Sequence, residues 1–404
     1  MRLRYRFRFY PTDEQAKSLV HVFGCCRYVY NFALRLRADS YQVGKTLNYN
    51  ASSAALTALK SDKDHSWLND VSCVPLQQAL RHLQTAFKHF FKKRAAYPAF
   101  KKKRSKQSAE YTRSAFKWNA ESRTLTVAKL GKLKIRWSRT FTSNPTTVTI
   151  TKDTIGRYFV TFSLDELIEP MTETGESVGV DLGVAQLATL STGERIQNPR
   201  HFNKWQHRLA RAQRVLSRRQ KGSKRREKAR LRAAKIQAHI ADARRDYLHK
   251  VTTSLVRRFD AIYMEDLNVR GMVRNSRLAR SLSDASFFQF RQMVAYKCDW
   301  YGKKLKLVDR FFPSSKRCHI CGHVIEALPL SVREWCCPEC NTRHDRDENA
   351  AHNILTAGHA AVNARGGTVR PDKAAALTGK SRRTANHLSC KDAPHSSHSE
   401  IYPL

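Results

Sequence analysis

Three acidic residues of this chain lie in settings where a carboxylate could bind a metal ion. Asp181 interrupts the apolar run SVGVDLGV, Glu265 ends a second apolar run, AIYMEDL, and Asp347 lies at the start of a predicted helix. An unpaired buried carboxylate is costly, so such acids are usually paired with a cation or bound to a metal. If the three converge, they would hold two divalent ions about 3.5–4 Å apart and activate water for phosphodiester cleavage. Hard oxygen ligands favour Mg²⁺ or Mn²⁺.

Each acid taken alone also has an ordinary structural interpretation. A carboxylate at a strand end can simply be exposed, and Asp347, which precedes ENAAHNI, could cap the helix that follows it. The combination of three such acids on separate segments favours catalysis, and this interpretation requires that the fold bring them together.

Two C-x-x-C pairs predict a second kind of metal site. Cys318 and Cys321 are separated by fifteen residues from Cys337 and Cys340, which is the spacing of a four-thiolate zinc ribbon. Thiolates select zinc over magnesium, and four protein ligands close the coordination sphere, so this zinc should be structural. Cys336 is interpreted as an apolar neighbour or an alternative ligand and is not counted. A redox C-x-x-C is less consistent with two pairs in one short segment.

The overall charge indicates a polyanionic partner. The 404 residues carry 74 Lys+Arg against 34 Asp+Glu, a formal net charge of +40. Basic residues are interleaved with aromatic ones, as in FKKRAAYPAFKKKRSK (91–106), which favours nucleic acid over a membrane surface. No apolar run is long enough to span a bilayer, and no secretion signal is expected at the Arg-rich start.

The elements before residue 170 predict a β module with a helical insertion. Arg4, Arg6 and Arg8 alternate with apolar residues in a strand over residues 2–10, and we favour phosphate contact over a merely solvated face. A helix is predicted over 75–95, and short β-rich runs follow over 124–164. These runs suggest a small barrel or sheet that pairs with the N-terminal strand.

A second domain is predicted from residue 176 onward. It opens with the strand that carries Asp181 and a hairpin, followed over 201–250 by a basic helical hairpin with 17 Lys+Arg and three acids. The strand ending in Glu265, a helix over 285–305 and a further strand come next. Residues after 361 have the composition of a disordered tail.

The motifs GVDLGV, MEDL, FFPSSKRCHICG, the double C-x-x-C and HDRDENAAHNI together resemble the TnpB family of transposon-encoded proteins, relatives of the type V CRISPR nucleases. The resemblance covers nearly the whole chain in order. It implies an α/β multidomain fold: an RNase-H-like, RuvC-type nuclease domain with an inserted zinc ribbon, and an N-terminal β-barrel wedge module with a helical recognition insertion.

The resemblance also assigns the site residues. It implies that Asp181, Glu265 and Asp347 are the catalytic acids and the Mg²⁺ or Mn²⁺ ligands. Asp345 competes with Asp347 for the third position, and we choose Asp347 because it opens the D-x-N-A-A helix of the family.

The expected partners are a guide RNA from the transposon end and double-stranded target DNA. Base pairing would read the target, and the protein would read a short flanking motif. By resemblance, the motif readers are expected around Tyr49, Ser53 and Gln77, although ordinary structural roles fit these residues as well. We expect a monomeric protein in a ribonucleoprotein complex, in the prokaryotic cytoplasm and at the nucleoid when bound to DNA.

The predicted organisation is, in chain order, a first wedge part (1–20), a helical recognition insertion (21–115), a second wedge part (116–170), a RuvC-like nuclease domain with the basic hairpin (176–312), the zinc ribbon (313–344), the final nuclease helix (345–362) and a disordered tail (363–404).

Two other functions are consistent with parts of the sequence. A transposase that carries out strand transfer itself would use the same acids, and no paired His-x-His motif of a tyrosine-nucleophile enzyme is evident. A non-catalytic nucleic-acid-binding regulator would use the zinc ribbon and the basic segments, and the presence of all three acids argues against it.

Overall fold

The computed structural model describes residues 2–363, which form two compact units. The first unit comprises Met1–Ile168 with Arg211–Ala238, and the second comprises Glu169–Ala210 with the residues from His239 onward. The tail predicted for 363–404 lies outside the described residues, apart from Asn363 at the end of the last helix.

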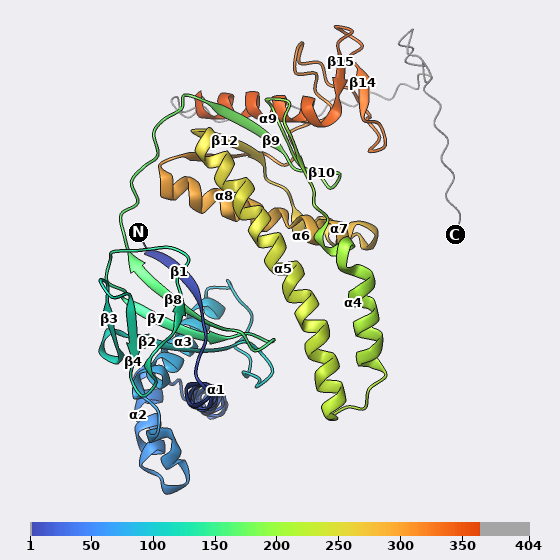
Figure 1. Ribbon diagram of the computed structural model, residues 1–404. Coiled ribbons are helices and arrows are strands. Elements are labelled where there is room, and N and C mark those ends of the chain that lie inside the picture. The colour runs from blue at the N-terminus through green and yellow to red at the C-terminus, as the bar shows by residue number, and fades with distance from the viewer. Residues whose placement is uncertain (1, 364–404) are drawn as a thin grey trace. The chain divides into compact units, whose positions relative to one another are not determined.

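The first unit is built on an antiparallel five-stranded sheet with the order β2-β7-β8-β1-β6 (Figure 1). Strand β1 (Arg2–Phe9) pairs along its whole length with β8 (Tyr158–Asp165), which confirms the predicted pairing of the N-terminal strand with the later β-rich runs. The other strands of this sheet are β2 (Gln107–Thr112), β6 (Ile135–Arg136) and β7 (Thr147–Lys152). A separate sheet contains β3 (Phe116–Asn119), β4 (Thr124–Val127) and β5 (Gly131–Lys132). Within the described part of this unit, the strand orders show two sheets and no closed barrel.

The N-terminal part of the same unit contains three α-helices. Helix α1 (Asp13–Gln42) starts with the capping box of Thr12 and Gln15, α2 spans Tyr49–Ser61, and a 3₁₀ helix (Lys63–Asn69) leads to α3. The helix predicted over 75–95 is confirmed as α3 (Cys73–Phe91), and its apolar stripe is buried as expected. A short 3₁₀ turn (Arg113–Ala115) follows β2.

The second unit contains a mixed five-stranded sheet with the order β11-β10-β9-β12-β13. The predicted hairpin is confirmed, because β9 (Ser177–Asp181) and β10 (Gln186–Leu190) pair antiparallel, and β11 (Arg195–Gln197) extends it. Strands β9, β12 (Ala261–Glu265) and β13 (Lys304–Val308) run parallel to one another. Two of the three acids predicted to be catalytic, Asp181 and Glu265, therefore end neighbouring parallel strands.

Helices flank this sheet on both faces. The basic hairpin is confirmed as α4 (His201–Ser217) and α5 (Lys224–Arg258), and α8 (Phe287–Tyr301) matches the helix predicted over 285–305. The apolar side chains of β9 and β12 that include Val178 and Met264 pack against the end of α5 and α8 in one buried cluster. Helices α6 (Val269–Met272) and α7 (Ser276–Ala285) precede α8. Across residues 2–363, no helix is both long and apolar enough to span a bilayer.

Helix α9 (Arg346–Asn363) covers the other face of the sheet (Figure 1). It approaches the strands so closely that two glycines are required at the crossing. A Cβ on Gly179 of β9 would lie 2.0 Å from the carbonyl oxygen of Ala351, and a Cβ on Gly358 of α9 would lie 2.0 Å from the ring of Tyr263. This packing fixes the start of α9, and hence Asp347, relative to β9.

Replacing Gly179 with Ala should lower the stability of the protein by about 1–3 kcal/mol, because the added methyl group meets backbone atoms of α9 that cannot rotate away. Thermal unfolding followed by circular dichroism measures the effect. Gly24→Ala in α1 is the control: no heavy atom among the described residues lies within 4 Å of its Cβ, so better helix propensity should raise the melting temperature slightly. Equal melting temperatures of Gly179→Ala and the parent would contradict the close packing.

Candidate catalytic acids and metal centre

The fold brings Asp181, Glu265 and Asp347 to one end of the central sheet. Asp181 is the last residue of β9 and Glu265 the last residue of β12, and the parallel register that pairs Val180 with Met264 places the two acids at the same level. Asp347 lies in the first turn of α9, which packs across β9. Three segments distant in sequence thus meet at one place, as the sequence analysis required.

The electrostatics of Asp181 reflect this convergence. Its pKa is raised to about 7, first by burial and then by the nearby carboxylates of Glu265 and Asp347, against the opposing effect of Arg346 and Arg333. A buried carboxylate whose charged form is disfavoured by burial and by two nearby acids is stabilised by a bound cation. Hard carboxylate oxygens in this arrangement suit Mg²⁺ or Mn²⁺.

Glu265 is held by a specific hydrogen bond. The hydroxyl of Ser314 donates to its Oε1 at 2.6 Å, while burial raises the pKa of Glu265 and this hydrogen bond opposes the rise. The next residue, Asp266, is paired instead with Arg291 and Arg310, which lower its pKa. Of these two adjacent acids, Glu265 is therefore the one without an arginine partner among the ion pairs of residues 2–363.

The geometry separates the two candidates for the third acid. Asp345 precedes α9, and its Oδ1 accepts hydrogen bonds from the backbone N–H groups of Asp347 (3.1 Å) and Glu348 (3.0 Å), so Asp345 is the N-cap. Its other oxygen pairs with Arg195 at 3.0 Å. Asp347 does not cap the helix, and it is the acid whose charge raises the pKa of Asp181.

Arg333 is a site residue that sequence reasoning missed. Its Nη1 donates to both carboxylate oxygens of Asp347, at 3.2 and 3.4 Å. The residue lies just before β14 (Glu334–Cys336), which pairs with β15 (Arg343–Asp345) directly before α9. This pairing, together with the backbone hydrogen bond from Arg346 to the carbonyl of Arg333, brings Arg333 to Asp347, and no sequence motif marks it.

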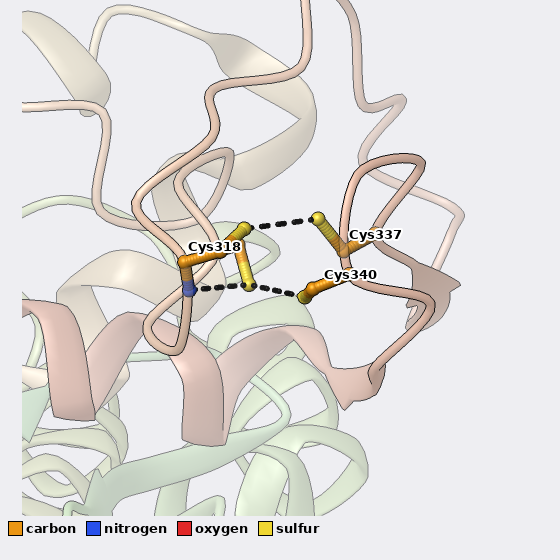
Figure 2. A group of neighbouring side chains, drawn as sticks. Cys318, Cys337 and Cys340 are labelled. Carbon is orange, nitrogen blue, oxygen red and sulfur yellow. Dashed lines mark hydrogen bonds between the residues drawn. The ribbon is translucent and has the colours of Figure 1, made fainter.

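The four cysteines of the two C-x-x-C pairs gather in one cluster, with their sulfur atoms all within 4.8 Å of one another (Figure 2). The Sγ atoms of Cys318 and Cys340 are 3.6 Å apart, and those of Cys321 and Cys337 are 3.5 Å apart. These distances are much longer than a disulfide bond of about 2.04 Å. They are close to the spacing of about 3.8 Å between ligands of a tetrahedral zinc ion with Zn–S bonds of about 2.3 Å.

The cluster has the surroundings of a structural zinc site. Cys318 and Cys337 are fully buried with Trp335 in a small apolar core. His344 lies beside Cys318, with its Nε2 3.1 Å from the sulfur, and the hydroxyl of Thr342 is 3.2 Å from the sulfur of Cys340. Four thiolates leave no open coordination position, which suits a fold-stabilising zinc.

The residues predicted to contact nucleic acid all lie in the first unit. Strand β1 alternates as predicted: Leu3, Phe7 and Phe9 are buried, while Arg4 and Arg6 are exposed and Arg8 is half-buried. Gln77 is exposed on α3, and Tyr49 and Ser53 lie one turn apart on α2. The guanidinium of Arg81, one turn after Gln77, lies over the ring of Tyr49 at 4.9 Å. Contact of these residues with nucleic acid stays a prediction.

Three protein-family models match parts of the chain. The model described as "Probable transposase", for OrfB of IS605, matches residues 148–276. A Cas12f1-like TNB domain matches residues 287–354, which include all four clustered cysteines, and a helix-turn-helix domain matches residues 1–46.

Full-length relatives establish the family. A protein of Streptomyces pristinaespiralis named "Putative RNA-guided DNA endonuclease" is 50% identical over 382 residues, covering 93% of this chain and 94% of the relative. "Putative RNA-guided DNA endonuclease InsQ" of Escherichia coli (strain K12) is 34% identical over 375 residues, covering 89% of this chain and 92% of the relative. The chain therefore belongs to the TnpB family, the OrfB proteins of IS605 transposons.

A solved structure shows the same fold. The cryo-EM structure of the Cas12f1-sgRNA-target DNA complex matches with a TM-score of 0.56 at 12% sequence identity, covering 88% of this chain and 98% of that one. At this identity the likeness concerns the fold alone, a mixed α/β multidomain architecture.

Asp181→Asn should raise the melting temperature of the protein in buffer without magnesium, and by more at pH 8 than at pH 5. Folded Asp181 has a pKa of about 7, against about 3.9 in an unfolded chain, so the folded state binds more protons between these values. The carboxylate therefore lowers the free energy of unfolding more and more as pH rises through this window. Because Asn carries no charge, Asp181→Asn escapes this loss of stability. Thermal unfolding at both pH values measures the difference.

Asp266→Asn is the matched control with the opposite sign. The pKa of Asp266 is lowered by Arg310 and Arg291, so its contribution is present above the unfolded pKa and is lost only at low pH. This variant should melt below the parent at pH 8. A melting temperature of Asp181→Asn at or below the parent's at pH 8 would contradict the burial of Asp181 beside Glu265 and Asp347.

Cys318→Ser should release one equivalent of zinc and lower the melting temperature by about 5–10 °C, because the metal staples a segment with a very small apolar core. Zinc content by mass spectrometry and thermal unfolding check this. Cys73→Ser, at an exposed free cysteine of α3, should change neither quantity. Full zinc content in Cys318→Ser would exclude Cys318 as a ligand.

Proposed function

We propose that this protein is an RNA-guided, divalent-metal-dependent endonuclease that cleaves double-stranded DNA next to a short flanking motif and is encoded by a transposable element. The observation that carries the proposal is the meeting of Asp181, Glu265 and Asp347 at one end of the sheet, where burial and then the two other carboxylates raise the pKa of Asp181 to about 7. Curated relatives that align over nearly the whole chain bear the name of this activity.

The chemistry proposed for the acids is that of a RuvC-type nuclease. Asp181, Glu265 and Asp347 would hold Mg²⁺ or Mn²⁺, which when bound supplies an activated water and stabilises the leaving oxygen of the scissile phosphodiester. Binding requires Asp181 to lose the proton that burial and its neighbours favour. The strand order β11-β10-β9-β12-β13 with α9 across it supports an RNase-H-like classification of this unit.

Arg333 is proposed to balance the charge of the third acid. It pairs with Asp347 through one nitrogen, Nη1, and is itself largely exposed. The guanidinium of an exposed arginine of this kind can release the carboxylate and donate instead to a phosphate oxygen when nucleic acid binds.

The proposed partners are a guide RNA and the target DNA. The net charge of +40 supports binding of several polyanionic strands at once, because each neutralised phosphate releases counterions. We assign Arg4, Arg6 and Arg8 to phosphate contacts and Tyr49, Ser53 and Gln77 to the flanking motif. The domain boundaries given by the sequence analysis, a monomeric ribonucleoprotein and a location in the prokaryotic cytoplasm belong to the same proposal.

The direct test is cleavage of a plasmid that carries a matched target by the purified complex of protein and guide RNA. We expect Mg²⁺-dependent double-strand cleavage, and a loss of about 10²–10⁴-fold in rate for Asp181→Ala, Glu265→Ala or Asp347→Ala. Asp345→Asn is the matched control, because Asn also caps helices and the variant should cut at nearly the parental rate.

Two outcomes would contradict the proposal. Cleavage by Asp181→Ala at the parental rate would remove the acids from the chemistry. Joined transposon–target products made by this protein alone would favour a transposase, the activity named by the matching family model.

A further inference from the structure

The turn that leads into the first cysteine pair touches one of the three clustered acids. Residues 313–317, from the motif FFPSSKRCHICG, form this turn, in which the backbone N–H groups of Lys316 and Arg317 donate to the carbonyl of Pro313. Ser314 is 4% exposed, and its hydroxyl donates to Oε1 of Glu265 at 2.6 Å. The turn is thus attached to the acid site by a buried side-chain hydrogen bond.

Two asparagines of α9 hold this turn from the other side. Asn353, 3% exposed, donates through Nδ2 to the carbonyl oxygens of Ser314 (2.8 Å) and Arg317 (2.5 Å). Asn349, 1% exposed, donates to the same two carbonyls at 3.4 and 2.8 Å, and its Oδ1 accepts from the backbone N–H of His319 at 3.1 Å. Buried amides that satisfy buried carbonyls in this way fix the backbone they bind.

These contacts connect the third acid to the second. Asp347 lies in the first turn of α9, two residues before Asn349. The helix that carries one acid therefore also holds the turn that binds Glu265. We propose that Ser314 is a positioning residue, which orients the carboxylate of Glu265 for divalent-metal binding and is itself held by Asn349 and Asn353.

The physical basis is the freedom of a glutamate side chain. Glu265 has three side-chain torsions, and if they rotated freely its carboxylate could turn away from the other acids. Metal binding would then have to order this side chain, at a cost in conformational entropy. With Oε1 engaged by Ser314, Oε2 remains available to a cation. Hydrogen-bond partners of metal ligands typically contribute 10–100-fold in metal affinity.

This inference rests on the proposed nuclease function, and its test is chosen to separate the two. Mn²⁺ binding to the full-length, zinc-loaded protein is measured by electron paramagnetic resonance, which requires neither guide RNA nor cleavage. Subtraction of the signal from Asp181→Ala identifies ions bound at the acids. We expect Ser314→Ala to raise the Mn²⁺ dissociation constant by about 10-fold or more.

The control variants distinguish orientation from general loss of structure. Ser177→Ala removes a hydroxyl that hydrogen-bonds to His359 at 2.9 Å; this more exposed bond joins β9 to α9 and does not involve the three acids. It should leave Mn²⁺ affinity unchanged. Ser314→Thr retains the hydroxyl and should recover most of the affinity lost in Ser314→Ala. Melting temperatures are recorded for all variants.

In the plasmid assay, Ser314→Ala should require about 10-fold more Mg²⁺ for half-maximal cleavage and approach the parental rate at saturating Mg²⁺. Parental Mn²⁺ affinity in a folded Ser314→Ala protein would overturn the positioning role and leave the proposed nuclease function intact. An equal loss of affinity in Ser177→Ala would also overturn it. Absence of cleavage by the parent would instead refute the proposed function.

Discussion

Burial of Asp181 beside two other carboxylates is the constraint on which the second unit is organised. Asp181, Glu265 and Asp347 meet where burial and their own charges raise the pKa of Asp181 to about 7. Nearby acids that have no catalytic assignment are neutralised differently: Asp266 by two arginines, and Asp345 by a helix N-terminus and Arg195. Of the three clustered acids, Asp347 is paired with Arg333, whereas Asp181 and Glu265 have no ion-pair partner among residues 2–363, in a protein of net charge +40. Bound divalent cations would offset the charge of these carboxylates.

Helix α9 is the element that makes this arrangement possible. Its close contact with the sheet at Gly179 and Gly358 removes any freedom to slide, so the position of Asp347 is set by backbone packing. The same helix binds the turn before Cys318 through Asn349 and Asn353. The segment that carries the four-cysteine cluster is therefore anchored to the helix that bears the third acid.

The sequence predicted those parts of the site that depend on local pattern. Asp181 and Glu265 were identified because each is a single acid within an apolar run, and the cysteine cluster was identified from its C-x-x-C spacing. Both signals are local patterns of a few residues. The choice between Asp345 and Asp347 needed the family motif, since two acids on either side of a helix start have the same local pattern. Arg333 and Ser314 were not identified, because their bonds to Asp347 and Glu265 arise from long-range packing. The N-terminal strand and the β-rich runs over 124–164 were predicted correctly, but β2 and β3 were not, and the barrel depended on a closure that local sequence does not determine.

Location of bound Mn²⁺ by anomalous X-ray scattering, in crystals of the protein with guide RNA and target DNA, tests the central claim most directly. The account predicts anomalous peaks between the carboxylates of Asp181, Glu265 and Asp347, with Oε1 of Glu265 still bonded to Ser314. The absence of any anomalous peak at these three carboxylates in saturating Mn²⁺ would contradict the account.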